Sequence, residues 1–114
     1  MKTAHFLKPD ITASQDLSAA ALDYTTTQTR AFKLEEITIK SSQNITETIT
    51  ITKDSNKGSA YDTVLVTRSL VAEADFVFRP QGESNFRAND NIRVQCTNAN
   101  AVGTLSVILS LSEM

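Results

Sequence analysis

Few residues of this chain have the side chains that commonly perform catalysis. His5 is the only histidine and Cys96 the only cysteine among 114 residues. A nucleophile needs a neighbouring base, and that base needs a group that orients it. Cys96 alternates with Ile92 and Val94, which is typical of a small apolar side chain in the core of a sheet. We therefore predict that the protein is not an enzyme and has no catalytic residues.

Carboxylates are the remaining candidates for chemistry. Glu73 and Asp75 are two residues apart, so a strand would place both on one face, where acid–base chemistry could use them. The same spacing is typical of a solvated sheet edge, which is the interpretation we favour. Asp90, between two asparagines, could offer oxygen ligands to calcium. The spacing of a calcium-binding loop is missing, however, and a turn is the simpler interpretation.

The counts of other ligand-forming residues argue against cofactors. One histidine and one cysteine are too few for a zinc site, and three glycines are too few for a glycine-rich phosphate loop. We expect no metal-binding residues, no cofactor-binding residues and no cofactor.

The charge of the chain bears on its partners. The formal net charge is −2 and the isoelectric point is about 5.3. A general nucleic-acid-binding protein needs a basic surface that displaces counterions from phosphates. The arginines form no run in the sequence; they are Arg30, Arg68, Arg79, Arg87 and Arg93. We expect no nucleic-acid partner.

The N-terminal sequence has no apolar region of the kind found in secretion signals, and Pro9 interrupts it. No apolar run approaches the roughly 20 residues that a membrane-spanning helix needs. Cys96 is alone, so it has no partner for a disulfide within the chain. We expect a soluble protein made in a cytoplasm, with no membrane partner.

Apolar residues two positions apart recur from Phe32 to Leu111. The series are Phe32 and Leu34; Ile37 and Ile39; Ile45, Ile49 and Ile51; Ile92, Val94 and Cys96; and Leu105, Val107, Leu109 and Leu111. Successive side chains of a strand point to opposite faces, so this period predicts a sheet with one buried face. The 15 threonines and 11 serines suit the solvated face.

The alternation changes phase across Glu35 and Glu36. A β-bulge would restore the buried face after one extra residue, and two strands meeting at a kink would be the alternative. Further on, Glu47 interrupts the apolar face, and we interpret it as an inward charge near a sheet edge that blocks unwanted pairing.

The second half of the chain contains four further predicted strands. The run Val64–Leu65–Val66, within a strand over 61–70, indicates a central strand covered on both faces. A separate strand over 74–79 ends before Pro80. Turns are expected at 54–58 and 89–91, and a hairpin loop over 98–103 would join the strands 92–96 and 104–112.

Residues 1–29 are polar and rich in threonine, unlike the remainder. We interpret them as one or two peripheral strands or as a docking arm, and residues 30–114 as a β-sandwich domain. About six strands in that domain, plus those before it, predict an antiparallel, jelly-roll-like sandwich of seven to eight strands. An immunoglobulin-like strand order is the alternative.

Residues 30–114 resemble small β-sandwich structural proteins of tailed bacteriophages. The resemblance lies in the order of four features: Gly58–Leu65 entering a strand, the exit Phe76–Pro80, the segment Asn89–Asn98, and Gly103–Thr104 before a closing strand. It implies a virion structural protein, such as a capsid decoration or minor head protein, made in the host bacterial cytoplasm. The expected partners are coat or other virion proteins and further copies of the chain, with a trimer as our guess.

A carbohydrate- or receptor-binding module of a phage tail is the alternative function. Such modules use exposed aromatic side chains, and Phe76 and Phe78 have the spacing of a shared strand face. Phenylalanines at alternating positions are also typical of a core. Tyr61 is a further candidate, and the chain has no tryptophan.

Overall fold

Two long strands joined by a hairpin dominate the computed structural model, which describes residues 10–81 and 85–113. β3 has 23 residues and β4 has 16, whereas strands commonly have about five or six. The elements are β1 (Asp10–Asp16), β2 (Leu22–Thr27), β3 (Phe32–Asp54), the 3₁₀ turn η1 (Ser59–Tyr61), β4 (Thr63–Phe78), β5 (Asn85–Phe86), β6 (Asn91–Cys96) and β7 (Thr104–Glu113).

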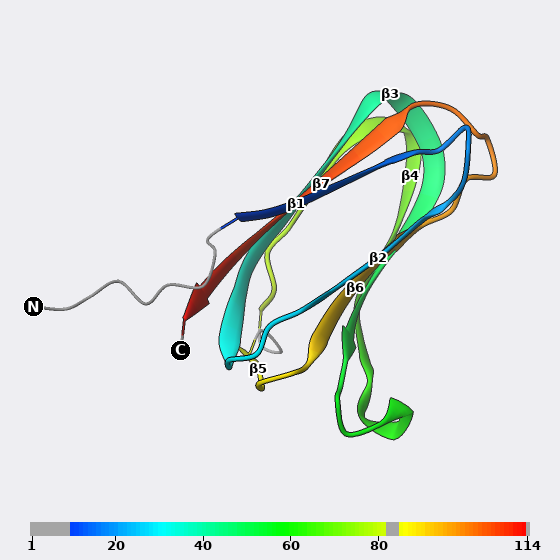
Figure 1. Cartoon of the computed structure of the whole chain (residues 1–114). Helices are drawn as coiled ribbons and strands as arrows, with labels where there is room; N and C mark the ends of the chain where they lie inside the picture. Colours follow the sequence, from blue (N-terminus) through cyan, green and yellow to red (C-terminus); the bar gives the residue numbers. More distant parts are fainter. Residues whose placement is uncertain (1–9, 82–84, 114) are drawn as a thin grey trace, which may run out of the picture.

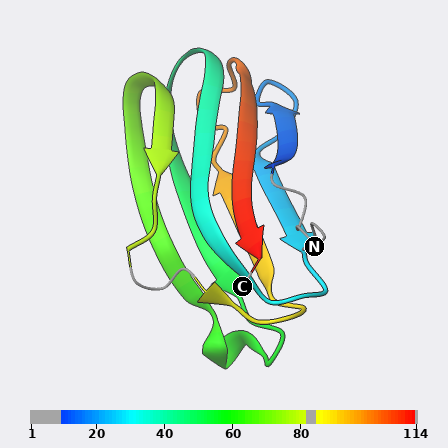
Figure 2. The same ribbon diagram turned by 90° about the vertical axis from the view of Figure 1, so that its left-hand side faces the viewer.

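The length of β3 and β4 lets both strands run through two layers. The first half of β3 pairs with β7, which pairs with β1, whereas the second half pairs with β6, which pairs with β2. β4 follows β3 through both layers, and every pairing is antiparallel. The layers are therefore β1–β7–β3–β4 and β2–β6–β3–β4, as Figures 1 and 2 show. This is a jelly-roll order, and the predicted all-β sandwich is confirmed.

The core lies between the two layers and follows the predicted two-residue period. Ile37 and Ile39 face it from one half of β3, and Ile49 and Ile51 from the other. Phe32 stacks on Phe86 with ring centroids 4.7 Å apart, which closes the end of the sandwich near β5. The remaining buried apolar side chains are Leu17, Leu22, Leu34, Ile45, Leu70, Ile92, Val94, Cys96, Leu105, Val107, Leu109 and Leu111.

The phase change in β3 is a β-bulge, as predicted. The register with β7 shifts between Leu34 and Glu36, while Leu34 and Ile37 are both buried. The extra residue restores the inward direction of the apolar side chains after Glu35 and Glu36, which is what a bulge does.

β4 corrects two predictions. The expected strands over 61–70 and 74–79 are one continuous strand, and Tyr61 lies in η1 before it. The strand is not central: among the described residues it pairs only with β3, so it is the outer strand of both layers. The side chain of Val64 is 58% exposed. A run of β-branched residues favours strand formation on an exposed edge as well as in a covered position.

The loop between β6 and β7 is not a hairpin connection, in contrast to the prediction. β6 pairs with β2 and β3, and β7 pairs with β1 and β3, so the loop carries the chain from one layer to the other.

The N-terminal region contributes strands to both layers. β1 and β2 are the strands at the edge opposite β4, and Leu17 and Leu22 next to them are buried in the core. Of the two interpretations of residues 1–29, strands describe residues 10–27, which are part of the sandwich rather than a separate arm. Residues 1–9, which include His5, lie outside the described residues.

Candidate functional site

Glu47 is a buried carboxylate at the end of the sandwich where β3 bends. It accepts hydrogen bonds from Thr97 Oγ1 at 2.7 Å, from the Ala99 N–H at 2.9 Å and from the Asn100 N–H at 2.8 Å. Burial acts to raise its pKa, but these hydrogen bonds outweigh burial, and the pKa lies below the usual value. The predicted role against unwanted strand pairing is wrong, because Glu47 orders the loop between β6 and β7.

Asp90 has a similar role at the opposite end. Its buried carboxylate accepts the N–H of Asn56 at 3.0 Å and that of Arg87 at 2.9 Å. It therefore connects the β3–β4 hairpin to the loop before β6. Asn89 has φ 69°, so the predicted turn is present. The described residues contain no group of three metal-ligating side chains of the His, Cys, Asp or Glu type.

Cys96 faces the core, as its alternation predicts. Burial, with a smaller contribution from the charge of Glu47, raises the pKa of its thiol to about 11. The S–H donates to the carbonyl of Thr97 at 3.3 Å. A nucleophilic cysteine needs its thiolate, so this thiol is inert at neutral pH.

Glu73 and Asp75 both lie on β4, the outer strand. A register shift against β3 falls between them, and Asp75 is paired in register with Lys40. Glu73 accepts the N–H of Val71 and forms an ion pair with Arg68 at 3.4 Å. Arg68 also lies over the ring of Phe76, 5.2 Å from its centroid. These contacts fasten the bend of β4.

Three of the four exposed large hydrophobic residues in the described part of the chain lie on β4. Its most exposed apolar side chains are Val64 at 58%, Val71 at 68% and Val77 at 45%. At the bend, the Ala72 N–H donates to Thr46 Oγ1 at 3.1 Å. Elsewhere along the outer edge of β4, no strand of the described chain pairs with it. Such an edge is a template for another strand.

A small apolar depression of about 140 Å³ lies beside this edge. It is lined by residues from both ends of β4 and the segment after it, namely Thr63, Val64, Leu65, Phe78, Pro80 and Gln81. The two ends of β4 belong to different layers, so the depression lies at the β4 edge of the sandwich, between the two layers.

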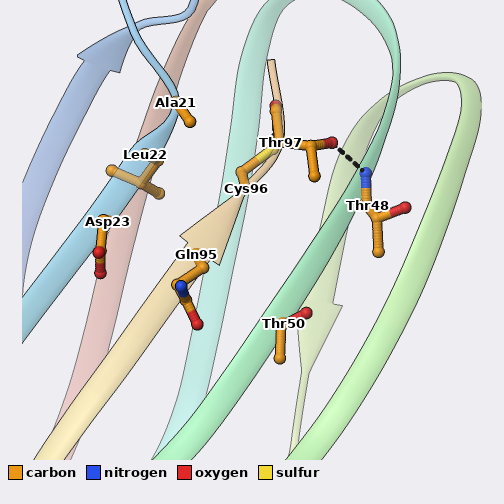
Figure 3. Close-up of a pocket in the computed structure, with 8 residues that line it drawn as sticks. All are labelled: Ala21, Leu22, Asp23, Thr48, Thr50, Gln95, Cys96 and Thr97. Carbon is orange, nitrogen blue, oxygen red and sulfur yellow. Dashed lines mark hydrogen bonds between the residues drawn. The ribbon is translucent and has the colours of Figure 1, made fainter. Parts of the chain in front are cut away.

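A second depression, of about 270 Å³, lies on the layer containing β2, β6 and the second half of β3. Figure 3 shows its lining: Ala21, Leu22, Asp23, Thr48, Thr50, Gln95, Cys96 and Thr97. The Thr48 N–H donates to Thr97 Oγ1 at 2.9 Å. Asp23 is held by Arg93, whose guanidinium donates to both carboxylate oxygens and lowers the pKa of that carboxyl. The lining thus mixes hydroxyl, amide and carboxylate groups with the apolar side chains of Ala21 and Leu22.

The largest of these depressions, about 460 Å³, lies at the tip of the β3–β4 hairpin. Its lining combines cations with an exposed ring: Lys53, Ser55, Lys57, Tyr61, Arg87 and Asp90. The residues come from three separate segments and form no motif, so the sequence did not predict this group. Tyr61, expected at the start of a strand, was predicted only as a candidate aromatic residue for carbohydrate binding.

The comparison with solved structures concerns the fold. The chain is similar to the crystal structure of PirA, with a TM-score of 0.53, 10% sequence identity and 96% coverage of both chains. At this identity the likeness extends to the fold alone. No protein-family model and no curated protein matches the chain. Among the described residues, no helix has the length and apolar character needed to cross a membrane.

Proposed function

We propose that this protein is a non-enzymatic structural protein of a bacteriophage virion, a decoration or minor head protein that binds neighbouring coat subunits. The observation that carries the proposal is the outer edge of β4, which is 16 residues long, bears exposed valines and has no partner strand among the described residues. The resemblance of residues 30–114 to phage β-sandwich proteins supports it.

Binding through this edge is strand addition. The main-chain groups of β4 bond an extended segment of a coat subunit, and the exposed valines contact its side chains. The apolar depression between the two ends of β4 accepts a side chain of the added strand. Main-chain bonding supplies affinity, and the side-chain contacts set the register.

Association with further copies uses the second half of this edge, in the layer of β1, and leaves the first half to the coat segment. β4 lies at one side of the sandwich, and β1 and β2 lie at the other. Pairing β4 of one copy with β1 of the next is a heterologous contact, and such contacts close into rings when the rotation permits. A trimer is the ring we propose.

The polar groups that could have formed a catalytic site have structural contacts instead. Glu47 and Asp90 accept backbone N–H groups from loops, and Cys96 is a protonated core thiol. These contacts favour a rigid binding protein over an enzyme.

The location of the protein in virions tests the proposal. Antibodies raised against the recombinant protein are applied, with gold labels, to intact phage particles produced by bacteria that carry the gene. Labelling of the head is the expected result. Labelling confined to the tail would replace this function with the receptor-binding alternative, and particles without label would overturn both.

The alternative, a carbohydrate- or receptor-binding module of a tail, rests on Tyr61. Its ring is 63% exposed, whereas Phe76 and Phe78 are half-buried and pack against the core. An aromatic platform made by the two phenylalanines is therefore not favoured, and a ligand would have to contact the hairpin tip.

A further inference from the structure

The depression at the tip of the β3–β4 hairpin has the size and lining of a ligand site. Its volume of about 460 Å³ falls in the range of small-molecule pockets, about 300–1,000 Å³. Three segments build it: the end of β3 and the following turn, η1, and the loop before β6. Its lining includes none of the valines of β4 that carry the proposed function.

Two of its cations have no acidic partner within the described chain. Lys57 and Arg87 are exposed, and neither forms an ion pair with any residue that the structure describes. Arg87 offers a planar fork of N–H donors that matches the oxygens of a carboxylate or sulfate. The one carboxylate in the lining, Asp90, is buried and bonded to two backbone N–H groups.

The third cation is positioned by its neighbours. Lys53 Nζ donates to the carbonyl of Asn85 at 3.0 Å and lies 5.4 Å from the ring centroid of Phe86. These two contacts hold the ammonium group at the wall of the depression. The site thus has one positioned cation, Lys53, and two exposed cations, Lys57 and Arg87, whose side chains can adjust to a ligand.

The backbone of the tip is ordered before any ligand arrives. The Ser55 N–H donates to Asp62 Oδ1 at 2.9 Å, and the Lys57 N–H donates to Ser55 Oγ at 3.1 Å. Asp90 connects this turn to the opposite loop through Asn56. A preorganised site loses less conformational entropy when it binds.

Tyr61 adds an apolar surface beside these charges. An exposed tyrosine ring offers a flat face to the C–H groups of a sugar, and its hydroxyl offers a hydrogen bond. The hydroxyl of Ser55 is a further polar group in the lining. A neutral sugar has no negative charge for the three cations to bind. A simple oxyanion such as sulfate has no apolar face to contact the ring of Tyr61.

We propose that this tip is a binding site for an acidic saccharide. The carboxylate or sulfate of the sugar lies among Lys53, Lys57 and Arg87, and its ring lies on Tyr61. The site is independent of the coat-binding edge, since it shares no residue with the valines of β4. One function can therefore fail while the other persists.

Titration of the full-length protein followed by ¹H–¹⁵N NMR tests the proposal, with a sulfated uronic-acid disaccharide, maltose and inorganic sulfate as probes. We expect the acidic disaccharide alone to shift resonances of the tip at low millimolar concentration or below. K57A/R87A should weaken its binding about tenfold or more, because it removes two of the three cations that bind the anionic group. K33A/K40A changes the net charge equally on exposed positions of β3 and should bind as the wild type does.

Two further variants separate the contributions to the site. Y61A should weaken binding of the disaccharide, and Y61F should retain most of it, because the ring face remains. Equal weakening by K57A/R87A and K33A/K40A would show a non-specific effect of charge and overturn the site. Binding of inorganic sulfate as tight as that of the disaccharide, with Y61A unaffected, would overturn the saccharide assignment. Binding of maltose equal to that of the acidic sugar would overturn the role of the cations.

Discussion

At the scale of single residues, buried carboxylates connect loops that strand pairing leaves unconnected. Glu47 orders the loop between β6 and β7, and Asp90 joins the β3–β4 hairpin to the loop before β6. A buried carboxylate that accepts several N–H groups is stable in its charged form. The removal of such a carboxylate leaves buried donors without acceptors.

Glu47→Gln should lower the free energy of unfolding by about 1–3 kcal/mol at pH 7. The pKa of Glu47 is lowered in the folded state, so its carboxylate stabilises the fold above its ordinary pKa of 4.5. That stabilisation is lost as the pH falls through the lowered folded-state value. The variant and the wild type should therefore converge at acidic pH.

Urea unfolding at several pH values measures this difference. Glu35→Gln, at an exposed position of the same strand, is the control and should change little. A constant difference between the Glu47 variant and the wild type across the pH range would contradict the assigned role of the charge.

At the scale of elements, the unusual feature is that one strand forms the edge of two layers. β4 has a bend at Val71–Ala72, where Ala72 adopts φ 52° and side chains accept both N–H groups. Before the bend, a further register shift against β3 leaves one extra β4 residue between Val64 and Val66. Edge strands commonly carry charges or prolines that prevent pairing, and β4 carries Arg68, Glu73 and Asp75 near its bend. Towards its two ends it also carries the exposed valines Val64 and Val77.

Val64→Lys with Val77→Lys should abolish self-association through this edge. The two lysines place charges where a second strand would pack, but they lie at exposed positions and should leave the fold intact. Size-exclusion chromatography with light scattering measures the native mass. The wild type should be a closed oligomer, a trimer in our proposal, and the variant a monomer.

Thr25→Lys with Ser106→Lys is the matched control, because it adds the same charge to exposed positions on other strands. This control should keep the oligomer. An oligomer that survives the β4 lysines would exclude the edge as the contact, and a wild type that is monomeric at high concentration would exclude the ring.

At the scale of the whole molecule, the N-terminal strands complete the sandwich. β1 pairs along seven residues of β7, and β2 pairs along six residues of β6. Without β1 and β2, the core would lose its contacts with Leu17 and Leu22. β7 and β6 would then become edge strands. The N-terminal strands are therefore needed for a stable fold.

Deletion of residues 1–29 should prevent cooperative folding, whereas deletion of residues 1–9 leaves every described strand in place and should preserve it. Circular dichroism with thermal unfolding distinguishes the two proteins. A shortened chain 30–114 that unfolds at the temperature of the full chain would contradict the place of β1 and β2 in the core.

Local sequence determined the direction of the side chains in β3, β6 and β7. The two-residue period identified the buried face of β3, β6 and β7, and the phase change at Glu35–Glu36 identified the bulge, because both depend on neighbours along the chain. The alternation of Cys96 likewise predicted its buried position.

Only the tertiary structure decided which strands lie at the edges and which distant residues meet. The run Val64–Val66 has the same local pattern at an edge as in a central position, so its exposure depended on whether another strand pairs with β4. Glu47 finds its partners about fifty residues away in the β6–β7 loop. Lys57, Tyr61 and Arg87 come together only because two loops meet at Asp90. These features follow from long-range pairing, which no local period of side chains encodes.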